Sequence, residues 1–295
     1  MNTETEVPSR IAVASIEDDS TDFGTVVLAP ARAIHSRIHA EVGRYRLRLA
    51  QSVEDLDAVC RLRFKVFNIE LGKGLESSYE TGLDTDDFDL FCEHLLVEEK
   101  TEHKIVGTYR MQSGMTAARN LGYYSEQEFD FSPYEALRGE VLELGRASID
   151  REHRTPEVLT LLWRGIAQYA VDMQLRYLIG CSSLNSEDPR EGWRMFRQLS
   201  NYRVAERLST RPAVGFVCPG ELAVEEPESA CQEVTAISEP VKVPKLLKTY
   251  LAIGARICGA PAWDREFGTI DFLTLLDLRT ISSSARNRFL APLAE

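Results

Sequence analysis

The chain has 295 residues, of which 44% are hydrophobic and 27% charged, as in an ordinary globular protein. A formal net charge of −12 argues against nucleic acid as a partner. No apolar run approaches the roughly 18 residues of a membrane-spanning helix. The first residues are acidic and polar, unlike a secretory signal. We therefore expect a cytoplasmic protein, and peripheral contact with the inner membrane is left open.

The six cysteines and five histidines show no spacing that is typical of a metal site. None of the cysteines belongs to a C-x-x-C pair, and most lie within apolar patterns, so we expect buried, reduced thiols. The sequence predicts no metal and no cofactor.

The first predicted elements follow a polar N-terminal segment. Residues 1–43 are expected to form a partly disordered tail with at most a short helix near 30–42. Residues 45–50 alternate between apolar and polar side chains and predict a strand. Residues 52–67 predict a helix with Ser52 as its N-cap.

The middle of the chain predicts a hairpin, a strand and a long helix. Residues 94–98 and 104–112 are two strand-like segments joined by a polar turn. Residues 141–149 predict a further strand. Residues 155–175 begin with Thr-Pro and then carry an apolar stripe at helical spacing, which predicts the clearest helix of the chain.

The last third predicts shorter elements around a loop-rich region. We expect a buried strand at 177–182, a helix at 188–199, a proline-rich loop at 212–240, a helix at 244–258 and a strand at 272–278.

This order favours an α/β (α+β) fold, in which helices flank both faces of a mixed sheet. We expect a single domain over residues 44–280, followed by a C-terminal tail over residues 281–295.

Arg63 is a charged residue within an apolar pattern. A charge on the inward face of a helix must be paired or must face a ligand. Either a substrate carboxylate or an ion pair with an aspartate explains Arg63, and so does a side chain that snorkels to solvent. The apolar stripe around it consists of Leu56, Val59, Cys60, Val66 and Phe67.

Residues 141–149 (VLELGRASI) place two charged residues in a predicted strand. In a regular strand Glu143 and Arg146 would point to opposite faces. A bulge at Gly145 would bring both to one face and bend the strand open. The alternative is a regular strand with a solvated Glu143.

The junction at residues 150–157 (DREHRTPE) combines a helix N-terminus with Arg151 and Arg154. Free backbone N–H groups at a helix start bind phosphate. Because the junction contains no glycine, it suits one phosphate, such as that of phosphopantetheine, better than a pyrophosphate. The alternative is ordinary capping of the helix by Thr155.

Charge is distributed unevenly along the chain. Residues 146–211 contain eleven arginines, no lysine and eight acidic residues, a local balance of +3, so the rest of the chain carries −15. Such a basic region is a candidate docking site for an acidic partner. Elsewhere, four aspartates between residues 84 and 89 form either a solvated acidic loop or a site for a cationic group.

Seven segments together resemble a known family. They occur in the order of the family's motifs: RLRFKVFNIE (61–70), DDFDLFCEHLLVEE (86–99), IVGTYRM (105–111), LELGRASI (142–149), LLWRGIAQY (161–169), IGC (179–181) and GAPAWDREFGTIDFLTLLD (259–277). The chain resembles the ornithine N-acyltransferases and hemolysin-like proteins of the GNAT superfamily. More distantly it is similar to acyl-homoserine-lactone synthases and N-acyl amino acid synthases.

The resemblance implies a GNAT fold, with a mostly antiparallel sheet that is splayed at a bulged central strand. It implies transfer of a (3-hydroxy)fatty acyl chain from acyl-carrier protein to the α-amine of ornithine, which gives lyso-ornithine lipid. The residues that match the charged signature shared with the lactone synthases are Arg63, Phe67, Asp86, Asp89, Arg110, Glu143 and Arg146.

From these residues we expect Glu143 to act as a general base and Arg146 to belong to the catalytic site. Backbone N–H groups near residues 145–147 would stabilise the oxyanion. The substrate-binding residues expected to hold the acceptor's carboxylate or ammonium, or to line the site, are Arg63, Phe67, Asp86, Asp89 and Arg110; the phosphopantetheine would meet Arg151, Arg154 and Thr155.

Three alternatives to this function remain. In the first, the acceptor is another amino acid, such as glycine. In the second, the chain makes lactones, which requires S-adenosylmethionine and fits poorly with the long C-terminal extension. In the third, the chain is a non-catalytic, hemolysin-like binding protein. The presence of Glu143 and Arg146 argues against the third.

Overall fold

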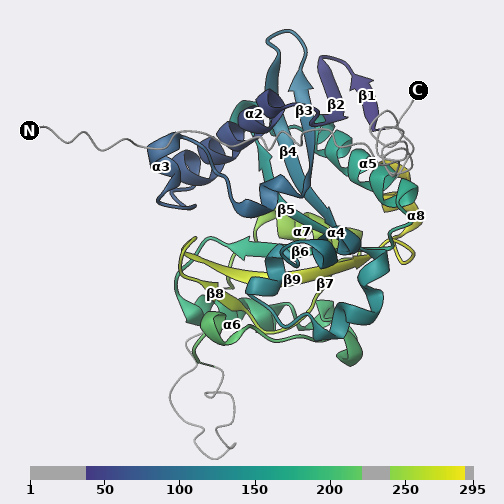
Figure 1. Ribbon diagram of the computed structural model, residues 1–295. Helices are drawn as coiled ribbons and strands as arrows, with labels where there is room; N and C mark the ends of the chain where they lie inside the picture. The colour runs from purple at the N-terminus through teal and green to yellow at the C-terminus, as the bar shows by residue number, and fades with distance from the viewer. Residues whose placement is uncertain (1–37, 221–239, 290–295) are drawn as a thin grey trace, which may run out of the picture.

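The computed structural model describes residues 38–220 and 240–289, which fold around a single sheet (Figure 1). Neighbouring strands are antiparallel apart from the pair β5–β6, so the sheet is mixed and mostly antiparallel, as the sequence predicts. The strands, in their order across the sheet, are β1 (His39–Val42), β2 (Tyr45–Leu49), β3 (Glu93–Glu99), β4 (Lys104–Ser113), β5 (Val141–Ile149), β6 (Tyr177–Leu184), β9 (Thr269–Asp277) and β7 (Arg256–Ile257), with β8 (Ala262–Asp264) also paired to β9.

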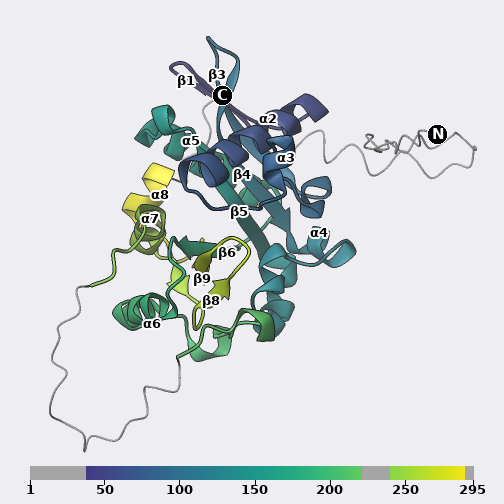
Figure 2. The ribbon, with the colours of Figure 1, turned by 90° about the vertical axis from the view of Figure 1, so that its left-hand side faces the viewer.

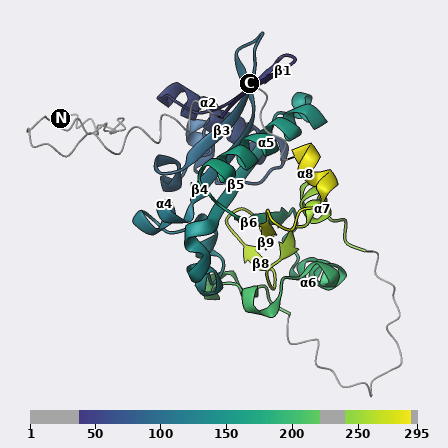
Figure 3. The ribbon, with the colours of Figure 1, turned by 90° about the vertical axis from the view of Figure 1, so that its right-hand side faces the viewer.

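Helices cover both faces of the sheet. The α-helices are α2 (Val53–Phe64), α3 (Ser78–Thr81), α4 (Gly114–Arg119), α5 (Pro156–Asp172), α6 (Pro189–Gln198), α7 (Lys245–Ile253) and α8 (Ser283–Phe289). Helix α2 contacts strands β3 to β5, whereas α5 contacts strands β1 to β4. Figures 2 and 3 show the two helices from opposite sides of the molecule. None of the described helices is long and apolar enough to cross a membrane.

The two long predicted helices begin where the sequence indicates. The side chain of Ser52 caps α2 by accepting a hydrogen bond from the N–H of Asp55 at 3.2 Å. Thr155 caps α5, and Pro156 occupies its first turn, where a missing N–H is harmless. Helix α2 continues into a π-helical turn, Lys65–Glu70, and Phe67 of this turn lines the cavity of the candidate active site.

Strands β5 and β6 separate after a short parallel contact. They pair only through Val141–Glu143 and Tyr177–Ile179. Gly180 allows the last close approach, because a Cβ at this position would lie 2.2 Å from the carbonyl oxygen of Leu144. Beyond this point the sheet opens: in Figure 1 strands β3 and β4 run upward while β6 and β9 cross the lower half. This opening is the predicted splay.

The bulge lies at Arg146 and not at Gly145. Gly145 pairs with Arg110 and Ser148 with Thr108, so two residues of β5 face only Tyr109 of β4. Arg146 has a φ of +50°, in the left-handed region, whereas Gly145 does not. The predicted bulge is therefore real but displaced by one residue.

Described structure extends past both predicted ends of the domain. Residues 39–42 form strand β1 in place of a helix, since the turn at Gly43 pairs them with β2; residues 1–37 of the predicted tail lie outside the described residues. At the other end α8 packs Phe289 against Trp163 of α5, in the core. The predicted helix at 244–258 also ends early, because Gly254 adopts a φ of +115° and the chain turns into β7.

Candidate active site

Two cavities meet where β5 and β6 separate. The larger has a volume of about 280 Å³ and the smaller about 70 Å³. The larger cavity is lined by Glu143 and Asp271 and lies on the face of the sheet that α2 covers. The smaller cavity is lined by Leu178 and Leu276 and lies on the face that α5 covers. The residues that line both cavities are Leu144, Gly145, Arg146, Ala147, Cys181 and Leu246.

The smaller cavity is mainly apolar. Trp163 of α5 and Tyr250 of α7 form one wall, with ring centroids 5.6 Å apart, and Leu178 and Leu276 form another. The hydroxyl groups of Tyr109 and Tyr250 form a hydrogen bond with each other at 2.6 Å. This cavity has the chemistry to accept hydrocarbon next to the open edge of β5.

Glu143 projects from β5 into the larger cavity and is 4% exposed. Its two carboxylate oxygens accept hydrogen bonds from the backbone N–H groups of Tyr124 and Ser125, at 2.8 and 2.7 Å. Burial raises the pKa of Glu143 above its ordinary value, and these N–H groups oppose that rise. The result is a fixed, buried carboxylate whose proton affinity is increased, as a general base requires.

Arg146 lines the same cavity from the bulge. Its guanidinium lies 3.1 Å from Asp86 and 3.3 Å from Asp84. It also lies over the rings of Tyr124 and Phe267, at 4.9 and 4.5 Å from their centroids. Burial alone would lower the pKa of Arg146, but Tyr124 and the two carboxylates keep that pKa above its ordinary value. The bulge thus brings Glu143 and Arg146 to one cavity, as predicted.

Arg63 is fully buried in an ion-pair network behind the cavity. Its guanidinium donates to Asp84 at 2.7 Å and to both oxygens of Asp89 at 2.7 and 3.0 Å. Burial alone would raise the pKa of Asp89, but Arg63 and Arg110 hold it well below its usual range. We call the set the arginine–aspartate network; its members are Arg63, Arg110, Arg146, Asp84, Asp86 and Asp89.

The network contains three of the predicted substrate-binding residues. Arg63 lies outside the cavity wall and forms the ion pairs with aspartate that were one of the alternatives. Asp86 and Asp89 accept hydrogen bonds from arginines and also lie outside the cavity wall, so their contact with a substrate ammonium stays a prediction. Of the five predicted substrate-binding residues, Phe67 and Arg110 line the cavity.

Comparison with known proteins shows the family of the chain. The family model described as "Acetyltransferase (GNAT) domain" matches residues 62–164. An L-ornithine N(alpha)-acyltransferase of Brucella abortus (strain 2308) is 32% identical over 255 residues, covering 83% of this chain and 89% of the relative. The chain belongs to the L-ornithine N(alpha)-acyltransferase family. It is an acyltransferase with a GNAT fold, as the sequence predicts.

A second relative and two solved structures are also similar to the chain. The L-ornithine N(alpha)-acyltransferase of Rhizobium meliloti (strain 1021) is 31% identical over 278 residues, covering 89% of this chain and 88% of the relative. Among solved structures, FeeM, an N-acyl amino acid synthase from uncultured soil microbes, superposes with a TM-score of 0.48 at 12% identity, over 84% of this chain and 97% of that one. The AHL synthase LasI gives 0.48 at 11% identity, over 86% and 99%.

The predicted phosphopantetheine residues of this family member lie outside both cavities. The Thr155 side chain accepts from the N–H of Val158 at 3.4 Å and so caps α5. Arg154 forms an ion pair with Glu70, whose neighbour Leu71 lines the larger cavity. Arg151 is exposed. Their role in binding the donor remains a prediction.

The basic region at 146–211 does not form one free positive surface. Arg146 is buried in the site, and Arg176 pairs with Asp277 at 2.6 Å. On α6, Arg190 pairs with its own N-cap Asp188 at 3.0 Å, whereas Arg197 is exposed. The exposed arginines of the region are distributed over the start of α5, helix α6 and the loop after α6, where Arg203, Arg207 and Arg211 are exposed.

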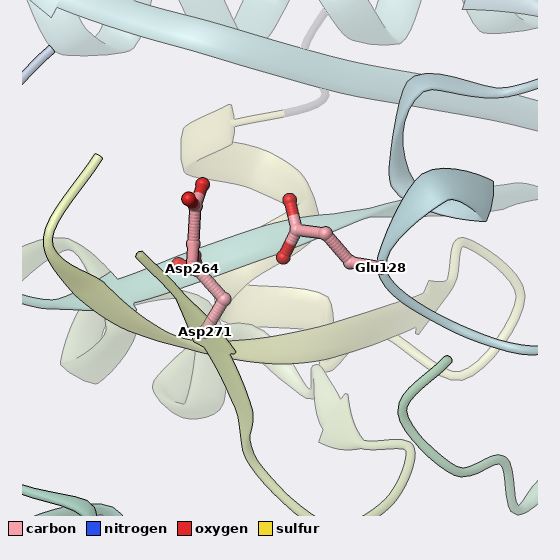
Figure 4. Close-up of side chains that lie close together, drawn as sticks. All are labelled: Glu128, Asp264 and Asp271. Atoms are coloured by element: carbon pink, nitrogen blue, oxygen red, sulfur yellow. The ribbon is translucent and has the colours of Figure 1, made fainter. Parts of the chain in front are cut away.

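Sequence reasoning missed a cluster of three carboxylates in the larger cavity: Glu128, Asp264 and Asp271 (Figure 4). Asp264 and Asp271 fall within the family motif at 259–277, but nothing in their spacing indicates that they meet Glu128. The cluster could hold a cation, although the sequence predicts no metal site.

Proposed function

We propose that this chain transfers a (3-hydroxy)fatty acyl chain to the α-amine of ornithine and so makes lyso-ornithine lipid in the cytoplasm. The observation that carries the proposal is Glu143, a buried carboxylate that faces a cavity at the open edge of a bulged strand. The names of relatives that are 28–32% identical supply the acceptor.

The chemistry needs a neutral amine. Glu143 takes the proton of the acceptor's α-ammonium, directly or through one water molecule, and the free amine attacks the thioester carbonyl. Backbone N–H groups of residues 145–147 meet the oxyanion, because β5 has left β6 at this point. Collapse of the tetrahedral intermediate forms the amide and expels the thiolate, which takes up the second proton of the amine, while Glu143 releases the first proton to solvent.

The two cavities separate the two substrates. The acceptor occupies the larger cavity, where Arg110 and Arg146 are the guanidinium groups available to its carboxylate. The start of the acyl chain enters the smaller apolar cavity beside Trp163 and Tyr250. The thioester carbon then lies in the gap shared by both cavities.

We propose acyl-carrier protein, rather than coenzyme A, as the acyl donor. The junction at 150–156 has no glycine to wrap a pyrophosphate, while the N-terminus of α5 with Arg151 and Arg154 suits one phosphate. Exposed arginines on α6 would attract the acidic surface of a carrier protein.

The test is acyl transfer by the purified chain, followed by mass spectrometry of the product. With 3-hydroxyacyl–acyl-carrier protein we expect the N-acyl product from ornithine and little from glycine. Acylation of glycine at an equal or higher rate would overturn ornithine as the proposed acceptor. Equal rates from acyl-CoA would overturn acyl-carrier protein as the proposed donor. The absence of any amide product would refute the proposed function.

A further inference from the structure

Glu128, Asp264 and Asp271 converge from three parts of the chain, and we call them the acidic triad. Glu128 follows the 3₁₀ turn Tyr124–Gln127, Asp264 ends β8, and Asp271 lies on β9. All three line the larger cavity and are 4%, 6% and 3% exposed. One oxygen of each lies within 4.8 Å of the others, and Figure 4 shows the carboxylates facing one another.

The acidic triad has no cation of its own. Within residues 38–220 and 240–289, no Lys, Arg or His nitrogen lies within 4.0 Å of its oxygens. The Oδ2 atom of Asp271 accepts from the hydroxyl of Thr269 at 3.0 Å, but its Oδ1 atom is buried without a hydrogen-bond partner. A buried carboxylate oxygen without a donor is unfavourable, so the triad is incomplete as it stands.

The electrostatics agree with this geometry. Burial, followed by the charges of Asp271 and Asp264, raises the pKa of Glu128 well above its ordinary value. Burial and the charge of Asp264 raise the pKa of Asp271 to about 6. A bound cation would reverse both effects, because it favours the ionised carboxylates.

We propose that the acidic triad binds the side-chain ammonium of the diamino acid acceptor and thereby selects ornithine over amino acids without a second amine. This inference rests on the proposed function. An ammonium carries three N–H donors, one for each carboxylate. Three acceptors about 2.9 Å from one tetrahedral nitrogen are at most roughly 4.7 Å apart, so carboxylate oxygens that lie within 4.8 Å of one another are close enough to share one ammonium.

The position of the triad suits an acceptor that also reaches Glu143. The same short segment supplies the N–H of Ser125, which holds Glu143, and then Glu128, three residues later. The thiol of Cys181 lines the same cavity, 3.8 Å from Glu128, and its pKa is raised by burial and by the charges of Glu128, Asp271 and Glu143. Glu143 and the triad thus line one cavity, which the two amines of a single diamino acid would share.

The triad also directs the reaction to one of the two amines. A negative site keeps the bound side-chain amine protonated, and a protonated amine has no lone pair with which to attack. The α-amine is intrinsically the weaker base of the two, so it is the one that Glu143 can deprotonate. Binding at the triad therefore produces acylation at the α position.

The test compares two acceptors in three enzymes. Ornithine and norvaline, which lacks only the side-chain amine, are assayed with the wild type, with Asp271→Asn and with Glu128→Gln. We expect the wild type to prefer ornithine in kcat/KM by on the order of 100-fold, the range of two charge-assisted hydrogen bonds. In both variants this ratio should fall toward 1, mainly through a higher KM for ornithine. Glu135→Gln is the matched control, since Glu135 is exposed and pairs with Arg138.

Each outcome decides between explanations. A wild-type ratio retained in both triad variants would overturn the inference and leave the proposed function intact. If the wild type acylates neither amino acid, the proposed function fails; ornithine binding without donor, measured by calorimetry, then tests the triad alone. If EDTA abolishes wild-type activity and Mg²⁺ or Ca²⁺ restores it, the triad is a metal site and the ammonium assignment is wrong.

Discussion

Two buried sets of charges lie beside the same cavity and differ in one respect. The arginine–aspartate network contains three arginines and three aspartates that form ion pairs with one another. The acidic triad contains three carboxylates and, within the described residues, no cation. Each set has buried atoms without a hydrogen-bond partner, Asp84 Oδ2 and Arg146 Nε in the network and Asp271 Oδ1 in the triad, but only the network balances its charges within the folded chain. The comparison teaches that charge balance, rather than burial, distinguishes the two sets.

Glu143 is intermediate between these two sets. Two backbone N–H groups hold it, as in a structural pair, and the charge of Arg110 acts on it from a distance, but no guanidinium among the described residues forms an ion pair with it. A carboxylate that is oriented and yet not neutralised keeps its basicity, which is what proton transfer requires.

A substitution in the arginine–aspartate network should have the largest effect on stability. Arg63→Ala removes the 2.7 Å bond to Asp84 and the two bonds to Asp89, and leaves these buried carboxylates with Arg146 and Arg110 alone, so we expect a loss of about 3 kcal/mol in the free energy of unfolding. Urea denaturation measures it. The control is Arg61→Ala, which removes an exposed pair with Asp57 and should change stability by about 1 kcal/mol or less. A stable but inactive Arg63→Ala enzyme would show that Arg63 contacts substrate after all.

Replacing the carboxylate of Glu143 should stop catalysis and leave the fold intact. Glu143→Gln keeps the shape of the side chain but not its basicity, and we expect kcat to fall on the order of 100-fold or more. Because the pKa of Glu143 is raised, wild-type kcat/KM should rise with pH as this group ionises, and the variant should lose that rise. Near-normal turnover would remove Glu143 from the mechanism.

Neutralising one member of the triad should stabilise the free enzyme. The folded pKa of Asp271, about 6, exceeds the unfolded value, so the ionised group opposes folding as pH rises from about 4 through 6. Asp271→Asn should therefore raise the free energy of unfolding at pH 8 by up to about 3 kcal/mol, and by almost nothing at pH 4. Thermal melting at both pH values measures the effect.

The control for that experiment is an aspartate that has a partner. Arg176 lowers the pKa of Asp277, so Asp277→Asn should destabilise the protein at pH 8. The same direction of change at both aspartates would contradict the comparison between balanced and unbalanced sets.

The smallest effect is expected at the surface. Arg194→Glu together with Arg197→Glu should raise the KM for acyl-carrier protein several-fold and leave the KM for ornithine unchanged, because these residues lie on α6 at the surface. The wild-type KM for the carrier should also rise with salt. Insensitivity to both changes would indicate that docking occurs elsewhere.

Local patterns predicted the elements well. The helix at Pro156–Asp172 and the hairpin of β3 and β4 depend on side-chain periodicity and caps within one segment, and both are present. The bulge was displaced because a glycine suggested it, whereas the fold places Arg146 in the left-handed region, where ion pairs and aromatic rings hold its side chain.

Contacts between distant segments were the part that sequence could not supply. Arg63 fitted both a ligand and an ion pair until Asp84 and Asp89 were found beside it. The triad joins residue 128 to residues 264 and 271, and each of these carboxylates alone looks like an ordinary loop or strand-end residue. Only the closure of β8 and β9 next to the 3₁₀ turn before Glu128 reveals the site.

The gap between β5 and β6 has a consequence for how such an enzyme can diversify. Its two cavities share the strand edge, α7 and β9, but Trp163 of α5 lines only the smaller cavity, and Glu128 with Asp264 of β8 lines only the larger. Under the proposed placement of the substrates, mutations of α5 would change the fatty chain that is accepted without touching the amine. The preference for the acyl chain could therefore change during evolution while the preference for the amine stays the same.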